Sequence, residues 1–238
     1  MFPYDEKILA AIRPLPTTIP EVLGAMQSIQ AICADEDGLK WFNWLYSAVT
    51  QTIESRVAEG GFSDPAWLSQ LDVQFAALYF NALASALTGG SCPGCWGAMF
   101  AVRNQARIAR IQFALAGMNA HINHDLPLAV MATSKAAGTI PRHGTPQYND
   151  YTGVNANLDS LIETAKETLN VRLPGDALPP VTHLEGAIAA WNLGAARESA
   201  WNTAEALWGE PPAPQAAHMD VIDGLTTVIS KSLLVPVP

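Results

Sequence analysis

The chain of 238 residues carries a formal net charge of −9 at pH 7, with 49% hydrophobic and only 15% charged side chains. Charged residues usually make up about a quarter of a globular domain, so we expect a large core in a single domain spanning residues 1–238. The 13 basic residues form no cluster, which argues against nucleic-acid binding, because phosphate backbones call for clustered Lys and Arg. No run approaches the roughly 20 apolar residues of a membrane span, and acidic residues stand where a signal peptide would be basic. We therefore expect a cytoplasmic protein without membrane insertion.

Helix signals dominate the first third of the chain. Thr18 and Glu21 form a T-x-x-E pair, which is typical of a capping box at a helix start. Asp64 is followed by proline, the pattern of an N-cap with proline in the first turn. Between these starts, apolar residues recur at helical spacing. The predicted helices here span 17–32, 37–57 and 63–87.

The rest of the chain is also predicted to be helical, apart from one irregular region. Residues 138–153 are predicted to form a loop, and a loop of that length in a compact domain is more often functional than idle. No alternation of period two persists anywhere, so strands are not expected. The remaining predicted helices span 97–135, 154–170, 184–208 and 216–232. The sequence thus predicts an all-α, single-domain bundle of seven or eight helices.

Cys92 and Cys95 form a C-P-G-C pair, a spacing shared with thioredoxin-like redox motifs. Such a motif needs a strand before it and a helix N-terminus after it. Here the pair lies in a glycine-rich connection between helical segments, so we interpret the two residues as ordinary loop cysteines.

The run from Asn119 to Pro127 holds two of the five histidines between almost wholly apolar flanks. His121 stands three residues before His124 and four before Asp125, so all three side chains can converge on one helix face. In one interpretation, Asp125 fixes the tautomer of His121 and raises its basicity, which makes His121 a general base near neutral pH. In a second interpretation, the three side chains ligate a divalent metal with further ligands from elsewhere.

A third interpretation is purely structural. Pro127 cannot donate a hydrogen bond to the carbonyl of Asn123, and it disfavours helix at Leu126. The helix is then expected to end near His124 and to restart with Asp125 as its N-cap. The polar cluster would in that case satisfy backbone groups at a buried helix break.

Two further groups of residues stand out by their helical position. Asp72 shares the apolar side of its helix with Tyr79, and a carboxylate there is costly unless it is paired, so Asp72 is a candidate partner for a histidine. Arg197 and Trp201 share a face of a tryptophan-rich helix and could wall a pocket for a flat or apolar ligand.

The chain resembles a family catalogued as a domain of unknown function, number 5995, which is frequent in actinobacteria. The resemblance covers most of the chain and rests on "IQFALAGMNAHINHDLPLAV" from Ile111, "LDVQFAALYF" from Leu71 and the W/AR/AW/LW series from Trp191. It implies no particular reaction. It does imply that the family's recurring polar positions are Asn43, Tyr46, Asp72, Tyr79, Asn119, His121, Asn123, His124, Asp125, Tyr151, Asn155 and Arg197.

The sequence favours a small-molecule enzyme of specialised metabolism that performs proton-transfer chemistry (cyclisation, isomerisation or hydration) on an apolar substrate. The catalytic candidates are His121, His124, Asp125 and Asp72. The substrate-binding candidates are Asn43, Tyr46, Tyr79, Asn119, Tyr151, Arg197 and Trp201. Cofactors are expected to be absent or limited to one divalent metal. The alternatives are a metal-dependent hydrolase or oxygenase that uses the His121/His124/Asp125 cluster, and a non-catalytic helical module that binds a hydrophobic ligand.

Overall fold

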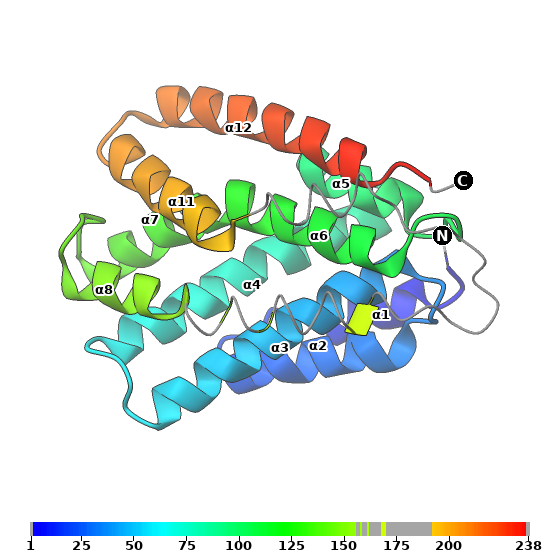
Figure 1. Cartoon of the computed structure of the whole chain (residues 1–238), viewed down its shortest axis with the longest axis horizontal. Helices are drawn as coiled ribbons and strands as arrows, with labels where there is room; N and C mark the ends of the chain where they lie inside the picture. The colour runs from blue at the N-terminus through cyan, green and yellow to red at the C-terminus, as the bar shows by residue number, and fades with distance from the viewer. Residues whose placement is uncertain (1, 156–157, 159–160, 162–167, 170–191, 237–238) are drawn as a thin grey trace.

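The computed structural model describes residues 2–155, 158, 161, 168–169 and 192–236, and these residues form helices and no β-strand (Figure 1). The all-α fold class predicted from the sequence is confirmed. Buried apolar side chains from all parts of the described chain belong to one hydrophobic cluster. No helix in these described ranges is long and apolar enough to cross a membrane. The elements are α1 (Asp5–Ala11), α2 (Ile19–Ile32), α3 (Gly38–Ala58), α4 (Pro65–Leu87), α5 (Gly94–Val102), α6 (Arg110–Ala120), the π-helical segment η1 (His121–Asp125), α7 (Leu126–Ala137), α8 (Pro146–Gly153), α11 (Leu193–Leu207) and α12 (Pro212–Leu233).

The continuous rod formed by α6, η1 and α7 lies in the middle of the molecule (Figure 1). Helix α6 packs against α3 and α12, and α7 packs against α4 and α11. Every residue of α6 from Ile111 to Ala120 is buried. A helix that is apolar all round is expected to be enclosed by other helices, and here it is. The polar side chains that this rod carries are therefore held inside the protein.

The predicted helix starts are made by the expected caps. The Thr18 hydroxyl accepts a hydrogen bond from the backbone N–H of Glu21, and the Asp64 carboxylate accepts one from Trp67. The Glu21 carboxylate reaches back to the backbone N–H of Thr17, at 2.7 Å, rather than to that of Thr18. The capping box is thus shifted by one residue on the Glu21 side. It still provides acceptors for the backbone N–H groups of Thr17 and Glu21, which have no partner within the helix.

The segment from 97 to 135, predicted as one helix, is divided in the structure. Helix α5 ends at Val102, and residues 103–109 connect it to α6. Arg103 leaves the helix at this point and forms ion pairs with Asp5 and Asp37, all three being buried. A buried guanidinium is stable only when its charge is paired, and this requirement draws the chain away from a continuous helix.

Two short helices were missed, and two predicted ones lie partly outside the described residues. Helix α8 occupies the region 138–153, which was predicted to be a loop; the Thr145 hydroxyl caps it by accepting from the backbone N–H of Tyr148. Helix α1 was not predicted. The predicted helices at 154–170 and 184–208 fall partly outside the described ranges, and α11 covers the end of the second.

Gly117 allows α6 and α3 to approach closely, and replacing it with alanine is expected to destabilise the fold. A Cβ atom at this position would lie 2.3 Å from Cδ2 of Phe42. The Phe42 ring is fully buried and in contact with Tyr46, Tyr79 and Trp96, so it has no room to move. We expect Gly117→Ala to lower the free energy of unfolding by about 1–3 kcal/mol, measured by urea denaturation.

The matched control is Gly24→Ala in α2. Gly24 is exposed, lies inside a helix, and has nothing within 4 Å of the added Cβ atom. Alanine there is expected to leave stability unchanged or to raise it by up to about 1 kcal/mol, because alanine is the better helix former. Equal effects of the two substitutions would contradict the close packing of α6 on α3.

Candidate functional site

Residues His121 to Asp125 continue the central rod as a π-helical turn. The backbone N–H of Leu126 bonds to the carbonyl of His121, five residues back. Pro127, which has no N–H and would clash with a carbonyl four residues back, follows directly. The wider turn accommodates it. The predicted helix break with Asp125 as a side-chain cap is therefore wrong: the chain stays helical, and the Asp125 side chain makes no capping bond.

The buried Asp125 carboxylate is the centre of a hydrogen-bonded cluster. One oxygen, Oδ2, lies 2.9 Å from Nδ1 of His121 and accepts a 2.9 Å hydrogen bond from Nε1 of Trp96. The other oxygen, Oδ1, lies 2.7 Å from Nδ1 of His124. The orientation of Asp125 is thus fixed from both sides. We refer to Trp96, His121, His124 and Asp125 as the Asp125 cluster.

Trp96 is the member of the Asp125 cluster that the sequence did not indicate. Its position depends on the start of α5, where the backbone N–H groups of Gly94 and Cys95 donate to the Asp223 carboxylate of α12, at 2.7 and 2.9 Å. This contact holds α5 against α12 and presents the indole N–H to Asp125. Asp223 and Asp125 are far apart in the chain, so no local pattern could have revealed the arrangement.

The electrostatics of the cluster give the two histidines different protonation states. Burial lowers the pKa of His121 below its usual 6.5, against the opposing effect of Asp125. Burial also disfavours the charged form of His124, but Asp125 and the nearby charges of Asp223 and Asp220 outweigh it and raise the His124 pKa. The pKa of Asp125 is lowered, since its hydrogen bonds to both histidines outweigh its burial.

His121 is consequently neutral near pH 7, and its tautomer follows from its partner. A carboxylate only accepts hydrogen bonds, so Nδ1 of His121 carries the proton. The other nitrogen, Nε2, is then an unprotonated acceptor. It is buried and has no hydrogen-bond partner among the described residues. A buried imidazole nitrogen with a free lone pair is available as a base.

Aromatic rings surround the His121 imidazole. Phe75 of α4 stacks on it, with ring centroids 3.4 Å apart and an angle of 5° between the planes. The Tyr46 ring lies 4.4 Å away, and those of Phe42 and Trp96 lie 5.8 Å away. These rings form an aromatic wall against His121, and their contacts bring α3, α4 and α5 to the π-helical turn.

The hydroxyls of Tyr46 and Thr50 and Oδ2 of Asp72 are also buried near this wall. Thr50 lies close enough to Tyr46 to lower its pKa, whereas Oδ2 of Asp72 has no hydrogen-bond partner in the described part of the chain. Burial and the charges of Asp72 and Asp125 raise the pKa of Tyr46, which places these groups near one another. Burial, together with the charge of Glu54, raises the pKa of Asp72 to about 7. Asp72 makes no hydrogen bond to any histidine that the structure describes, so the predicted partnership is not seen there. It is instead a carboxyl group that carries a proton for much of the time near neutral pH.

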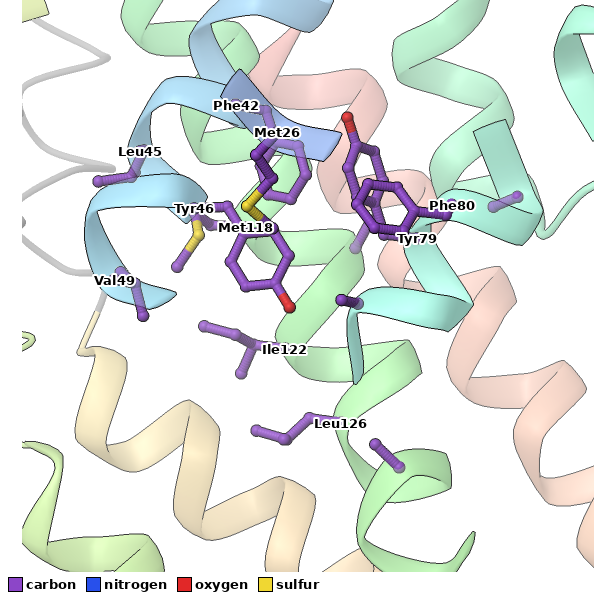
Figure 2. Packing of buried hydrophobic residues seen from close by; sticks show 14 of the residues in the cluster. Met26, Phe42, Leu45, Tyr46, Val49, Tyr79, Phe80, Met118, Ile122 and Leu126 are labelled. Atoms are coloured by element: carbon purple, nitrogen blue, oxygen red, sulfur yellow. The ribbon is translucent and has the colours of Figure 1, made fainter. Parts of the chain in front are cut away.

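The Tyr79 hydroxyl does not join this group. Figure 2 shows the Tyr46 and Tyr79 hydroxyls pointing in opposite directions. Burial and the charges of Cys33 and Asp37 raise the pKa of Tyr79 against the opposing charge of Arg103, which indicates that its hydroxyl lies near the Arg103–Asp37 ion pair. Tyr79 therefore contributes its ring to the wall around His121, but its hydroxyl faces the buried ion pairs near α1.

Two asparagines predicted to contact substrate instead tie helices together. The Asn43 amide donates to the Met26 carbonyl of α2 at 2.9 Å. The Asn119 amide donates to the Thr226 carbonyl and the Ser230 hydroxyl of α12, at 3.0 and 2.9 Å. Both amides thus bridge helices through their N–H groups, while Oδ1 of Asn43 is buried without a hydrogen-bond partner among the described residues.

Tyr151, Arg197 and Trp201 form a separate cluster between α8 and α11. The Arg197 guanidinium lies 4.2 Å from the centroid of the Tyr151 ring and donates to the Tyr151 carbonyl. The Trp201 and Tyr151 rings are 4.9 Å apart. Within the described part of the chain, these three side chains make no hydrogen bond, ion pair or ring contact with His121, so the predicted substrate-binding residues divide between two places.

The predicted metal ligands contact one another rather than a common point. Both histidines direct Nδ1 at Asp125, which leaves only their Nε2 atoms for a metal. No group of three or more His, Cys, Asp or Glu side chains within the described ranges is arranged to hold a metal ion.

The fold and the site together define the class of protein. It is an all-α protein with a buried histidine on a π-helical turn of its central helix, and a carboxylate orients that histidine. The chain matches the model of a family of unknown function, DUF5995, over residues 19–236, and it belongs to that family. The resemblance identified from the sequence is thereby confirmed. No curated protein and no solved structure matches the chain.

Asp125→Asn tests the arrangement of the cluster. Asn replaces one acceptor oxygen with an NH₂ group, which then faces the N–H of Trp96, or a histidine Nδ1 that must give up its proton to accept from it. A buried donor left without an acceptor costs about 1–3 kcal/mol, so we expect the free energy of unfolding to fall by that amount in urea denaturation. Asp220→Asn, at an exposed carboxylate of α12, is the control and should be neutral. An unchanged stability of Asp125→Asn would contradict the three-donor arrangement.

Proposed function

We propose that the protein is an enzyme that moves a proton on an apolar small molecule, with His121 as the general base. The observation that carries this proposal is the unpartnered Nε2 of a buried histidine whose Nδ1 is held by Asp125. When Nε2 takes a proton from the substrate, the positive charge on His121 lies 2.9 Å from the Asp125 carboxylate. This fixed negative charge stabilises the imidazolium as it forms, and His121 needs no reorientation.

Asp72 and Tyr46 supply the acid side of the proposed reaction. A carboxyl group with a pKa of about 7 can be protonated at neutral pH and can donate that proton. The Tyr46 hydroxyl, whose raised pKa keeps it protonated, can donate a hydrogen bond to charge that develops on the substrate. One base and one acid in the same apolar surroundings suit isomerisation, cyclisation or hydration, in which a proton leaves one atom and another is added elsewhere.

The surroundings of His121 favour an apolar substrate. Phe75, Tyr46, Phe42 and Trp96 present rings to the imidazole. Such a wall stabilises hydrocarbon or aromatic surface and strengthens the electrostatic effect of the few polar groups inside it. A terpenoid-like or polyketide-like molecule with one activated C–H or C=C group fits this chemistry.

The test is deuterium incorporation from solvent. The protein is incubated in D₂O with a library of apolar terpenoid-like and polyketide-like compounds, and products are examined by mass spectrometry. We expect the wild type to yield a rearranged, hydrated or deuterated product, and His121→Gln to yield none. His143→Gln is the control, because His143 is an exposed histidine held between Glu198 and Glu205.

The results separate the alternatives. Equal product formation by the wild type and by folded His121→Gln would refute the proposed role of His121. Activity that is lost on chelation and restored by zinc, manganese or iron would favour the metal-dependent alternative instead.

A further inference from the structure

Arg197 differs from Arg103 and Arg110 in the groups that neutralise its charge. It is 7% exposed, and its guanidinium donates to two neutral oxygens, Oδ1 of Asn155 at 2.7 Å and the carbonyl of Tyr151 at 2.8 Å. Arg103, which is equally buried, pairs with two carboxylates, and Arg110, which stacks on a tryptophan, has an aspartate within 3.5 Å. Among the described residues, Arg197 has no carboxylate partner.

The nearest candidate carboxylate is already occupied. Glu198, the next residue in α11, accepts hydrogen bonds from the Tyr148 hydroxyl and lies 2.9 Å from Nε2 of His143. A buried cation without a counter-ion costs several kcal/mol, and proteins rarely keep one without a use for it. The guanidinium also has more N–H groups than the two that Asn155 and Tyr151 engage.

Two more donors without partners belong to the same aromatic cluster. Nε1 of Trp201, one turn along α11, is buried and unpartnered within the described ranges, as is Nε1 of Trp67 on α4. The two indole rings are in contact, with centroids 6.0 Å apart, and the Tyr151 ring touches both Trp201 and the Arg197 guanidinium. One aromatic cluster thus holds a buried cation without a carboxylate partner and two indole N–H groups without an acceptor among the described residues.

We propose that Arg197, together with the indole N–H groups of Trp201 and Trp67, binds the carboxylate of an apolar organic acid. A carboxylate would neutralise the guanidinium and accept from the indoles. The aromatic rings of Tyr151, Trp67 and Trp201 would contact the apolar body of the acid. This site is separate from the Asp125 cluster and does not depend on the function proposed for His121.

The experiment is a thermal-shift and calorimetric titration of the intact protein with benzoate, with acetate and inorganic phosphate as comparison probes at equal ionic strength. A ligand that binds only the folded state raises Tm with its concentration. We expect benzoate to raise Tm saturably, acetate to act more weakly because it lacks the ring, and phosphate to have no specific effect. A shift caused by phosphate but not by benzoate, or by none of the three, would overturn the proposal.

Two variants make the test specific. Arg197→Gln should abolish the benzoate-induced shift yet leave the Tm of the ligand-free protein unchanged or higher, because it removes an unpaired buried charge. Trp201→Phe keeps an aromatic side chain but replaces the indole with a smaller ring that has no N–H, and it should weaken benzoate binding by about tenfold or more. Arg110→Gln, which removes a paired surface arginine, should leave binding unchanged. Saturable benzoate binding that survives in Arg197→Gln, or a ligand-free Tm lowered by more than about 4 °C, would show that Arg197 is structural.

Discussion

His121→Gln is expected to lower turnover by about 10²–10⁴-fold, the range typically lost with a general base, while the protein stays folded. Gln has no basic nitrogen, so nothing in the aromatic wall can take the substrate proton. Its amide can still donate to Asp125, which preserves the hydrogen bond now made by Nδ1. The measurement is the initial rate with the substrate found in the deuterium screen, together with circular dichroism of both proteins.

The protonation state of His121 provides an independent check that needs no substrate. In nitrogen-15 spectra of the imidazole, we expect Nδ1 to be protonated and Nε2 unprotonated at pH 7, with a pKa below 6.5. A His121 that titrates above 6.5, or that carries its proton on Nε2, would contradict a base oriented by Asp125. His124 serves as the internal comparison, because its pKa is expected to lie above the usual value.

Asp72→Asn is expected to stabilise the protein at alkaline pH and to have little effect in acid. The folded pKa of Asp72, about 7, is raised above its ordinary value of 3.8. The stability linked to the protonated carboxyl group is fully present below about pH 4 and is lost as the pH rises through 7. The difference between these two pKa values corresponds to at most roughly 4 kcal/mol in the free energy of unfolding, at about 1.36 kcal/mol for each tenfold change in the acid dissociation constant. Asn stays neutral at every pH, so it avoids this loss.

Urea denaturation of wild type and Asp72→Asn at pH 4.5 and pH 8.5 measures the effect. The free energies of unfolding of the two proteins should be similar at pH 4.5. At pH 8.5 the variant should be the more stable protein. Glu54→Gln is the companion variant, because removing the charge of Glu54 should lower the pKa of Asp72. In that background, the stability difference that Asp72→Asn makes at pH 8.5 should be smaller. An Asn variant that is less stable at both pH values would show that the Asp72 carboxylate has a stabilising partner. A more stable but inactive variant is the expected signature of a residue kept for chemistry.

Much of the helical framework could be predicted because its signals are local. Proline and capping residues mark the starts of α2 and α4, and apolar spacing marks α3. The division of the central segment could not be predicted, since it depends on ion pairs between Arg103 and carboxylates 66 or more positions earlier in the chain. Helix α8 was not predicted, although Thr145 and Pro146 give the same kind of signal as Asp64 and Pro65.

Only the part of the candidate site that is formed by residues close together in the sequence could be predicted. The hydrogen bond between His121 and Asp125 follows from their spacing of four residues, and it is present. Trp96, Phe75 and the direction of the Tyr79 hydroxyl depend on how separate helices meet. Helical periodicity indicates which face a residue occupies, but it does not indicate which neighbour that face will meet. For the same reason, Asn43 and Asn119 could not be recognised as bridges to α2 and α12.

The π-helical turn has a consequence for how this protein can change by insertion or deletion. A π-helical turn holds one residue more than an α-helical turn, and each residue in an α-helix turns the chain by about 100°. The wide turn absorbs this extra residue, so loss of one residue between His121 and Asp125 would return the turn to α-helical geometry and bring the Pro127 ring against a carbonyl. It would also change the spacing of His121 and Asp125, on which their hydrogen bond depends. Loss of a single codon is thus enough to remove the turn that accommodates Pro127.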